Sequence, residues 1–338
     1  MPDIFLQTLQ RIPVQAVLFF VGVGVGGGSM YGYFRMQQTS AVDHVVEQRE
    51  NVSSFQYINP LIECGNSQEG QGFTQMHITK QDFETFISGL ETNEVKDISV
   101  YVRDLNNGPW FGVGEDFEYT PASLTKVPVM MAVYKRAESD PDILKKIIHT
   151  PDSLEQTLDQ KIVSQKIQPN HEYTIEELVR RSIIYSDNLA VSLAVQGIEQ
   201  DDLAKVFQSI NVPFEVSNND LMLSVREYAA FFRVLYNASF LSREHSELAL
   251  ALLTESEFQN GIVAGVPKDI AVAHKFGERN LASVGQDTIH QIHDCGIVYY
   301  PGRPYLMCVM TRGYNISKQE KAIADVSRFV YERVRKEN

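Results

Sequence analysis

Residues 119–134 read YTPASLTKVPVMMAVY, and from 127 to 134 every residue except one proline is apolar. A helix that is apolar on all sides is enclosed by the rest of its domain, so this stretch predicts a buried central helix. Ser123 and Lys126 stand three residues apart in its first turn and therefore share a face. Pro121 suits the first position of the helix, which places Ser123 near N–H groups that favour developing negative charge. A nucleophile needs that location, whereas the simpler interpretation is a buried helix whose polar start faces solvent.

Two further groups of polar residues are ambiguous when each is taken alone. Ser186, Asp187 and Asn188 follow an amphipathic helical pattern, and such a tripeptide is usually a loop or a helix cap. Lys275 emerges from an apolar strand pattern as the first residue of the tetrapeptide Lys-Phe-Gly-Glu. A lysine in that position is usually a solvated strand end.

Taken together and in this order, the three groups resemble the signatures of the penicillin-recognising serine enzymes, specifically the class A β-lactamase family. Those signatures are Ser-x-x-Lys, Ser-Asp-Asn and Lys-Thr-Gly. Ser123 and Lys126 match the first and residues 186–188 match the second. Lys275 and Gly277 match the third, with a phenylalanine where the family has threonine. The similarity covers about residues 73–338 and implies an acyl-transfer enzyme that needs no cofactor.

Acyl transfer requires a nucleophile, a base for its proton, a proton donor for the leaving nitrogen, and donors for the oxyanion. We expect Ser123 to be the nucleophile and Lys126 its base, which requires burial and a nearby cation to lower the pKa of that lysine. Lys275 is the expected cation and would also bind substrate. Ser186 would relay a proton between the two lysines and the departing amine, so Ser123, Lys126 and Ser186 are the predicted catalytic residues.

The remaining matched residues are assigned to substrate binding or to structure. Asn188 offers an amide to the acyl-side amide group of the substrate, and Gly277 belongs to the substrate-binding strand. The resemblance implies an oxyanion hole made from the backbone N–H groups of Ser123 and Glu278. Asp187 is expected to brace its turn rather than to touch substrate.

The sequence departs from the family in two respects. Phe276 lacks the hydroxyl that, in relatives, helps to bind the carboxylate of the substrate. Class A β-lactamases also carry a loop glutamate, within a Glu-x-x-Leu-Asn motif, that activates the deacylating water. Between Asn188 and residue 224 there is no such motif. Glu215 is the candidate that position allows, but a surface turn residue is the simpler interpretation, and no deacylation base is assigned.

The N-terminal part of the chain has a different character. Residues 12–34 form an uncharged run between Arg11 and Arg35. Because a helix rises 1.5 Å per residue, about 20 residues cross the hydrocarbon core of a bilayer, and this run is long enough. We predict a cytoplasmic stub with a single transmembrane anchor over 1–36, a polar tether over 37–72, and a serine β-lactamase-like domain over 73–338, held outside the cell membrane. A cleaved signal sequence, which gives a secreted protein, is the alternative.

Hydrophobic periodicity indicates the order of elements in that domain. It predicts a helix over 78–90, strands at 97–103 and 110–113, a helical middle from about 140 to 265, strands at 270–276, 288–300 and 305–311, and a helix over 317–336. Ser/Thr-x-x-Glu/Gln boxes at Ser153, Thr174, Ser224 and Ser317 mark helix starts. The first and last segments would then form one antiparallel sheet with a helical block inserted between them. The fold class is α+β or mixed α/β.

Composition narrows the possible partners. The formal net charge of -13 argues against nucleic acid or an anionic lipid surface. The three cysteines are too few for a disulfide scaffold and lack metal-ligand spacing, as do the histidines. Cys64 and Cys295 could pair outside the cytoplasm, while Cys308 is typical of a small core residue in a strand. We expect a monomer without metal or cofactor.

Three functions are consistent with these features. The first is a membrane-anchored, extracytoplasmic serine hydrolase that opens β-lactams through an acyl-Ser123 intermediate. The second is a peptidoglycan D,D-peptidase, acting on stem peptides, or another acyl hydrolase on the same scaffold, and the missing loop glutamate favours it. The third is a non-catalytic domain that binds β-lactams or cell-wall fragments. The retention of Ser123, Lys126 and the Ser-Asp-Asn group counts against the third.

Overall fold

The computed structural model describes residues 44–49, 55–67, 80–106, 110–153, 162, 165–214, 216–217, 220–284 and 287–336. The chain divides into two units, Met1–Val46 with Gly65–Gln71, and Glu47–Cys64 with Gly72–Asn338. Strands β1 (His44–Arg49) and β2 (Leu61–Ser67) pair in a two-stranded sheet. The predicted membrane run at 12–34 and much of the predicted tether lie outside the described residues. Within the described part, no helix is long and apolar enough to cross a membrane.

A five-stranded antiparallel sheet forms the centre of the second unit. Its strand order is β11 (Val272–Val284), β12 (Asp287–Val298), β13 (Tyr305–Gly313), β3 (Val95–Asp104) and β4 (Trp110–Val113). Strands β3 and β4 come from the start of the domain and β11 to β13 from its end. The predicted fold class is therefore confirmed: an antiparallel sheet built from both ends of the domain, with a helical block inserted between them.

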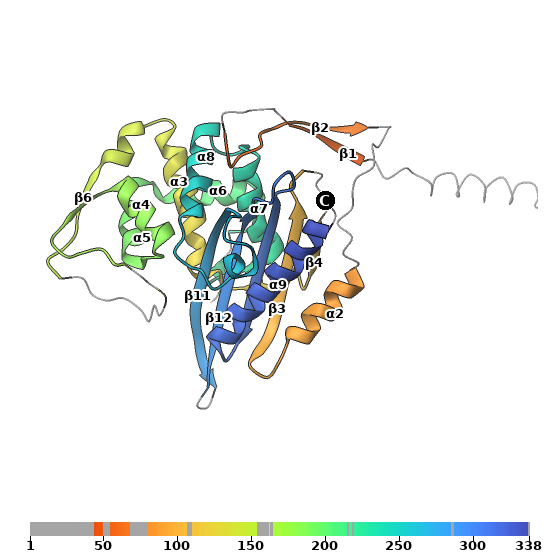
Figure 1. Cartoon of the computed structure of the whole chain (residues 1–338). Coiled ribbons are helices and arrows are strands. Elements are labelled where there is room, and N and C mark those ends of the chain that lie inside the picture. Colours follow the sequence, from red (N-terminus) through yellow and green to blue (C-terminus); the bar gives the residue numbers. More distant parts are fainter. Residues whose placement is uncertain are drawn as a thin grey trace, which may run out of the picture. The chain divides into compact units, whose positions relative to one another are not determined.

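Helices cover both faces of this sheet. Helices α2 (Lys80–Leu90) and α9 (Ile316–Lys336) lie on one face, where α2 contacts β4 and α9 contacts β12 and β13 (Figure 1). On the other face, α7 (Val225–Tyr236) contacts β3, β12 and β13, and α8 (Arg243–Thr254) contacts β11. The helical block consists of α3 (Lys126–Ala137), α4 (Ile175–Ile184), α5 (Asn188–Ala194), α6 (Gln200–Ser209), α7 (Val225–Tyr236) and α8 (Arg243–Thr254). Two apolar cores result, one on each face of the sheet.

Short elements join the helices and strands of the block. They are β5 (Glu118–Tyr119), η1 (Ala122–Thr125), η2 (Pro141–Lys145), β6 (Ile147–His149), β7 (Glu172–Thr174), η3 (Val195–Gly197), β8 (Val216–Ser217), β9 (Asp220–Leu221), β10 (Leu223–Ser224) and η4 (Ile262–Gly265). Strand β10 pairs with β5, which attaches the start of α7 to the segment that leads into η1.

Side-chain caps explain where two of the helices begin. The Thr174 hydroxyl accepts the backbone N–H of Glu177 at 3.1 Å at the start of α4. At the start of α7, Ser224 Oγ accepts the N–H of Glu227, whose carboxylate accepts the N–H of Ser224. Both helix starts were predicted from the box pattern, and such caps stabilise a helix by about 1 kcal/mol. The box at Ser153 reaches outside the described residues, and Ser317 lies inside α9 rather than at its cap.

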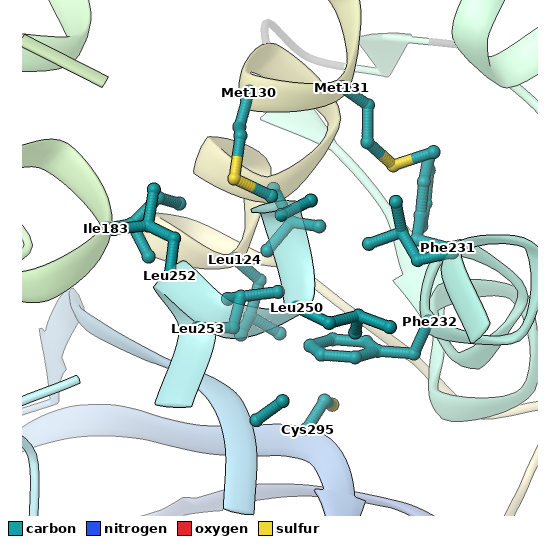
Figure 2. Packing of buried hydrophobic residues seen from close by; sticks show 14 of the residues in the cluster. Leu124, Met130, Met131, Ile183, Phe231, Phe232, Leu250, Leu252, Leu253 and Cys295 are labelled. Atoms are coloured by element: carbon teal, nitrogen blue, oxygen red, sulfur yellow. The ribbon is translucent and has the colours of Figure 1, made fainter. Parts of the chain in front are cut away.

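The predicted central helix is buried as expected. In α3, every residue from 126 to 134 is buried, because α4, α6 and α8 all pack against this helix. Leu124, Met130 and Met131 lie among leucines of α8 and the phenylalanines 231 and 232 of α7 (Figure 2). Since each large apolar side chain contributes about 1.5–3 kcal/mol when fully buried, this packing fixes the start of α3 firmly in the domain.

The pairing of Cys64 with Cys295, which the sequence left open, is not the one that forms. Cys295 forms a disulfide with Cys308, not with Cys64. The two residues face each other in register on the neighbouring strands β12 and β13. Cys308 is fully buried in a strand, as predicted. The register of the two strands, which the sequence pattern does not specify, decides the partner of Cys295.

Candidate active site

Ser123 lies in a tight turn that precedes α3. Residues Ala122–Thr125 form the 3₁₀ helix η1, and regular α-helix starts only at Lys126. The predicted single helix starting at Pro121 is therefore a 3₁₀ turn followed by an α-helix. Ala122, directly before the serine, has a φ of 51°, in the left-handed region that L-residues avoid. Such backbone conformations are concentrated at functional sites, where the surrounding packing holds them in place.

Lys126 is the centre of the hydrogen-bond network. Its Nζ lies 2.7 Å from Ser123 Oγ and 2.6 Å from Asn188 Oδ1. The same nitrogen lies 2.8 Å from the Ser186 carbonyl and 3.2 Å from Ser186 Oγ. Burial lowers the pKa of Lys126 to about 7, and the Asp187 carboxylate opposes this shift. Near neutral pH a large fraction of this amine is therefore unprotonated and able to accept the proton of Ser123.

Lys275 reaches the same network from the edge strand β11. Its Nζ donates to Ser186 Oγ at 2.9 Å and to the Phe276 carbonyl at 3.0 Å. Burial, and secondarily the positive charge of Lys126, lowers the pKa of Lys275. The sequence analysis assigned Lys275 as the cation that lowers the pKa of Lys126. In the structure burial is the main cause for both lysines, and the hydroxyl of Ser186 lies between their two nitrogens.

Ser186 owes its position to the turn that starts α5. It is fully buried and has a φ of 58°. Asp187 Oδ1 accepts the backbone N–H groups of Leu189 and Ala190, and its other oxygen accepts the N–H of Ile167 at 2.7 Å. The carboxylate thus holds the turn internally, which is the place predicted for it. With Asp187 capping the helix, Asn188 becomes the first residue of α5 and presents its amide oxygen to Lys126.

Gly277 allows strand β11 to lie directly against η1. A Cβ at this position would be 2.8 Å from the Pro121 carbonyl oxygen and 3.1 Å from Leu124 Cγ. Any larger residue would push β11, and Lys275 with it, away from Ser123. Glu278 follows on the same strand, and its Oε2 accepts the backbone N–H of Ile162 at 3.1 Å. The oxyanion role predicted for the backbone N–H groups of Ser123 and Glu278 stays a prediction.

Phe276 takes a place that the sequence analysis did not foresee. Its ring stacks on Phe258, with centroids 4.3 Å apart and planes 20° apart. Lys275 Nζ lies 4.1 Å from the Phe276 ring centroid, which is cation–π distance. Both rings border a cavity of about 170 Å³ that also reaches Tyr185, the residue before Ser186. Nothing in the sequence around Phe258 identifies it as a neighbour of the site, because 18 residues separate it from Phe276.

Other titratable groups lie away from the reacting centre. His274 Nδ1 is 2.9 Å from Asp294 Oδ1, and Asp294 Oδ2 accepts the N–H of Ile262. As strand alternation predicts, this buried pair belongs to the face of β11 opposite Lys275. Glu215, the position considered for a deacylation base, lies outside the described residues. In the part of the chain that the structure describes, no cluster of metal-binding side chains occurs.

The chain is similar to one family of known proteins and to several solved structures. Residues 81–334 match the profile of a family described as the beta-lactamase enzyme family. A structure of PBP-A is similar, with 23% identity and a TM-score of 0.63 over 78% of this chain and 97% of that one. A class A β-lactamase from Mycobacterium abscessus shares 22% identity, with a TM-score of 0.59 over 74% of this chain and 98% of that one.

A class A β-lactamase representative from Bacteroides cellulosilyticus shares 17% identity, with a TM-score of 0.65 over 76% of this chain and 98% of that one. Such identities are low, so these structures establish the fold alone. The search of curated proteins found no match.

Proposed function

The chain belongs to the β-lactamase enzyme family, and from this premise we propose that it opens β-lactam rings through an ester between Ser123 and the substrate acyl group. The observation that carries the proposal is the 2.7 Å contact between Lys126 Nζ and Ser123 Oγ, in a site where burial lowers the pKa of the lysine to about 7. A lysine is a useful base only when it is neutral near the working pH. Lys126 meets that condition.

The proposed acylation proceeds in two proton transfers. Lys126 takes the proton of Ser123 as Oγ attacks the lactam carbonyl carbon, and the carbonyl oxygen becomes an oxyanion. As the carbon–nitrogen bond breaks, the leaving nitrogen takes a proton from the Ser186 hydroxyl. Ser186 Oγ lies 3.2 Å from Lys126 Nζ and 2.9 Å from Lys275 Nζ, so either lysine can restore its proton. The relay is short because one hydroxyl lies between two amines.

A second candidate function is a D,D-peptidase that cleaves peptidoglycan stem peptides. Its support is the absence of a Glu-x-x-Leu-Asn motif after Asn188, which leaves the deacylating water without an identified base. Among the similar structures is a PBP-A variant in an acyl-enzyme complex with penicillin G, with 24% identity and a TM-score of 0.62. An enzyme that deacylates slowly would retain the drug as an ester, whereas a β-lactamase releases it.

We propose further that the domain works outside the cytoplasm, held by an N-terminal anchor at residues 12–34. The length of the uncharged run supports the anchor. The Cys295–Cys308 disulfide supports an oxidising compartment, because such bonds persist there. Separation of membranes from soluble material, with the protein detected in each, tests the anchor, and the alternative of a cleaved signal predicts a shortened soluble protein.

Turnover of a chromogenic cephalosporin tests the proposed function. We expect the wild type to hydrolyse it and both Ser123→Ala and Lys126→Ala to lose at least 100-fold in kcat/KM. Ser139→Ala serves as the matched control, because Ser139 is exposed and bonds only locally to the Arg136 carbonyl. Stoichiometric acylation without turnover would instead support the peptidase, and release of D-alanine from a synthetic stem peptide would establish it. Absence of both acylation and turnover would leave only the non-catalytic binding domain.

A further inference from the structure

A second cavity lies at the far edge of the central sheet from Lys275. Its volume is about 220 Å³, and it opens between α7 and the strands β3, β4 and β13. Strand β11, which carries Lys275, is one edge of the sheet, and β4 is the other, with β12, β13 and β3 between them (Figure 1). The cavity is therefore separate from the acyl-transfer site.

Three arginines line this cavity, which we call the arginine pocket. Arg226 and Arg233 come from α7 and Arg103 from β3. Arg226 and Arg233 share a helix face with Ala229 and Ala230, because these residues follow helical spacing. The two alanines leave room between guanidinium groups that start from the helix about 10 Å apart. Strand register places Arg103 opposite both Leu306 and Trp110, so all three side chains share the sheet face that α7 covers.

Arg226 and Arg233 differ in their partners. Arg226 pairs with Asp116 at 2.5 Å, where both side chains are exposed. Among the described residues, the Arg233 side chain forms no hydrogen bond or ion pair. The Arg233 guanidinium lies beside two other cationic side chains, so an anion in the cavity is favoured next to it. The three arginines lie together in a chain whose net charge is -13, so their cluster does not reflect a generally basic protein.

An aromatic pair adds a second kind of recognition to the pocket. Trp110 stacks on Tyr101, with ring centroids 5.4 Å apart and planes 23° apart. Tyr101 is buried while Trp110 is 44% exposed, so the tyrosine supports an indole ring that solvent reaches. An exposed, supported indole offers a flat apolar surface to a ligand ring. A guanidinium group meanwhile binds carboxylate or phosphate with two parallel hydrogen bonds.

We propose that the arginine pocket binds a sugar ring that carries a carboxylate or a phosphate. The anionic group binds to the Arg233 guanidinium, and the ring packs against Trp110. The size of the cavity favours a single ring, because 220 Å³ is less than the roughly 300 Å³ at which sites for drug-sized ligands begin. The proposal does not depend on the acyl-transfer chemistry, since the strands β12, β13 and β3 separate the two sites.

Trp110 makes the test direct, because it is the only tryptophan among the 338 residues. Its fluorescence therefore reports on the arginine pocket without a label. The full-length protein is titrated with D-glucuronate, glucose 6-phosphate, inorganic phosphate and neutral glucose. We expect a saturable change in emission with at least one acidic sugar, a weaker response to inorganic phosphate, and none to glucose at the same concentration. Comparison of the affinities for glucuronate and glucose 6-phosphate shows whether the pocket prefers a carboxylate or a phosphate.

Variants separate specific binding from a general charge effect. Arg233→Gln should weaken binding of the acidic sugar by about tenfold or more, because a hydrogen bond to a charged group is lost. Arg233→Lys should restore part of the affinity, and Ser123→Ala should bind like the wild type. Glucose that binds as well as the acidic sugars, an unaltered affinity in Arg233→Gln, or no saturable change up to tens of millimolar with either acidic sugar would each overturn the proposal. Unfolding curves monitored by circular dichroism establish that the variants are folded.

Discussion

Lys126 Nζ lies 2.7 Å from Ser123 Oγ, in a helix turn where the lysine is only 2% exposed. Burial of the Lys126 amine costs stability, because burial disfavours its charged form. The same effect lowers the pKa of Lys126 to about 7. That cost is understandable if the lysine acts as a base, because a shifted pKa is what base catalysis near neutral pH requires.

The first prediction concerns the pH dependence of acylation. Lys126 must be unprotonated to accept the Ser123 proton, so the acylation rate should rise with pH and level off above about 7. Stopped-flow measurement of penicillin acylation between pH 5 and 9 checks this. A rate that is independent of pH over that range would show that Lys126 does not titrate as the base.

The second prediction concerns stability. The pKa of Lys126 is lowered in the folded protein, so the unfolded chain binds more protons between pH 7 and the ordinary lysine pKa of 10.5. The free energy of unfolding contributed by this group therefore rises with pH across that window and is lowest below pH 7. Lys126→Met removes the buried amine and should raise the midpoint of thermal unfolding at pH 7 while abolishing acylation. A lower midpoint in Lys126→Met would mean that the hydrogen bonds outweigh the cost of burial.

The third prediction concerns the contact of β11 with η1. Gly277→Ala places a methyl group 2.8 Å from the Pro121 carbonyl, so the strand must move. We expect a loss of about 1–3 kcal/mol in the free energy of unfolding and at least tenfold slower acylation. Gly89→Ala is the matched control, because its Cβ meets nothing within 4 Å and alanine favours helix α2. Chemical unfolding and acylation kinetics on both variants provide the measurement, and wild-type kinetics in Gly277→Ala would contradict the account.

The fourth prediction concerns Phe276 and its stack with Phe258. Phe276→Thr introduces a hydroxyl next to Lys275 in the sequence. Phe276→Val is the matched variant, because valine has nearly the shape of threonine but no hydroxyl. Both variants lose the stacked ring and should be less stable by a few kcal/mol. We expect Phe276→Thr to be acylated faster than Phe276→Val by a penicillin with a free carboxylate, but equally fast by its ester. Equal rates with the free acid would show that residue 276 does not contact the substrate carboxylate.

The fifth prediction concerns the segment that precedes the domain. Glu247 on α8 accepts the backbone N–H groups of Gln56, Tyr57 and Ile58 at 2.7 to 3.1 Å. Glu247→Gln should cost about 1–3 kcal/mol and expose residues 55–60 to limited proteolysis, because an amide replaces the negative charge. Glu244→Gln, on an exposed position of the same helix, is the control and should resist proteolysis like the wild type. Equal cleavage of the two variants would refute the role of Glu247.

Much of the fold follows from patterns that are local in sequence. The buried run at 127–134 and the boxes at Thr174 and Ser224 depend on neighbouring residues, and the structure agrees with each. The sheet was predictable because its strands alternate and because the helical middle interrupts them. The three motifs at Ser123, Ser186 and Lys275 meet at one place in the structure, as their shared signature indicated.

What could not be predicted depends on contacts between distant residues. The disulfide partner of Cys295 follows from the register of β12 against β13. The stack of Phe276 on Phe258 depends on where the chain after α8 passes beside β11. The sequence predicted a lowered pKa of Lys126 from burial together with the charge of Lys275, whereas burial by several elements is the main cause in the structure. The arginine pocket likewise requires α7 to lie across β3.

The central claim is that Ser123 becomes acylated. Intact-protein mass spectrometry after incubation with penicillin G, followed by peptide mapping, tests it most directly. The account predicts the added mass of one penicillin on the wild type, located on the peptide that contains Ser123, and no addition to Ser123→Ala or Lys126→Ala. An unmodified wild-type protein that also leaves the penicillin intact, or a label located on any other residue, would contradict it.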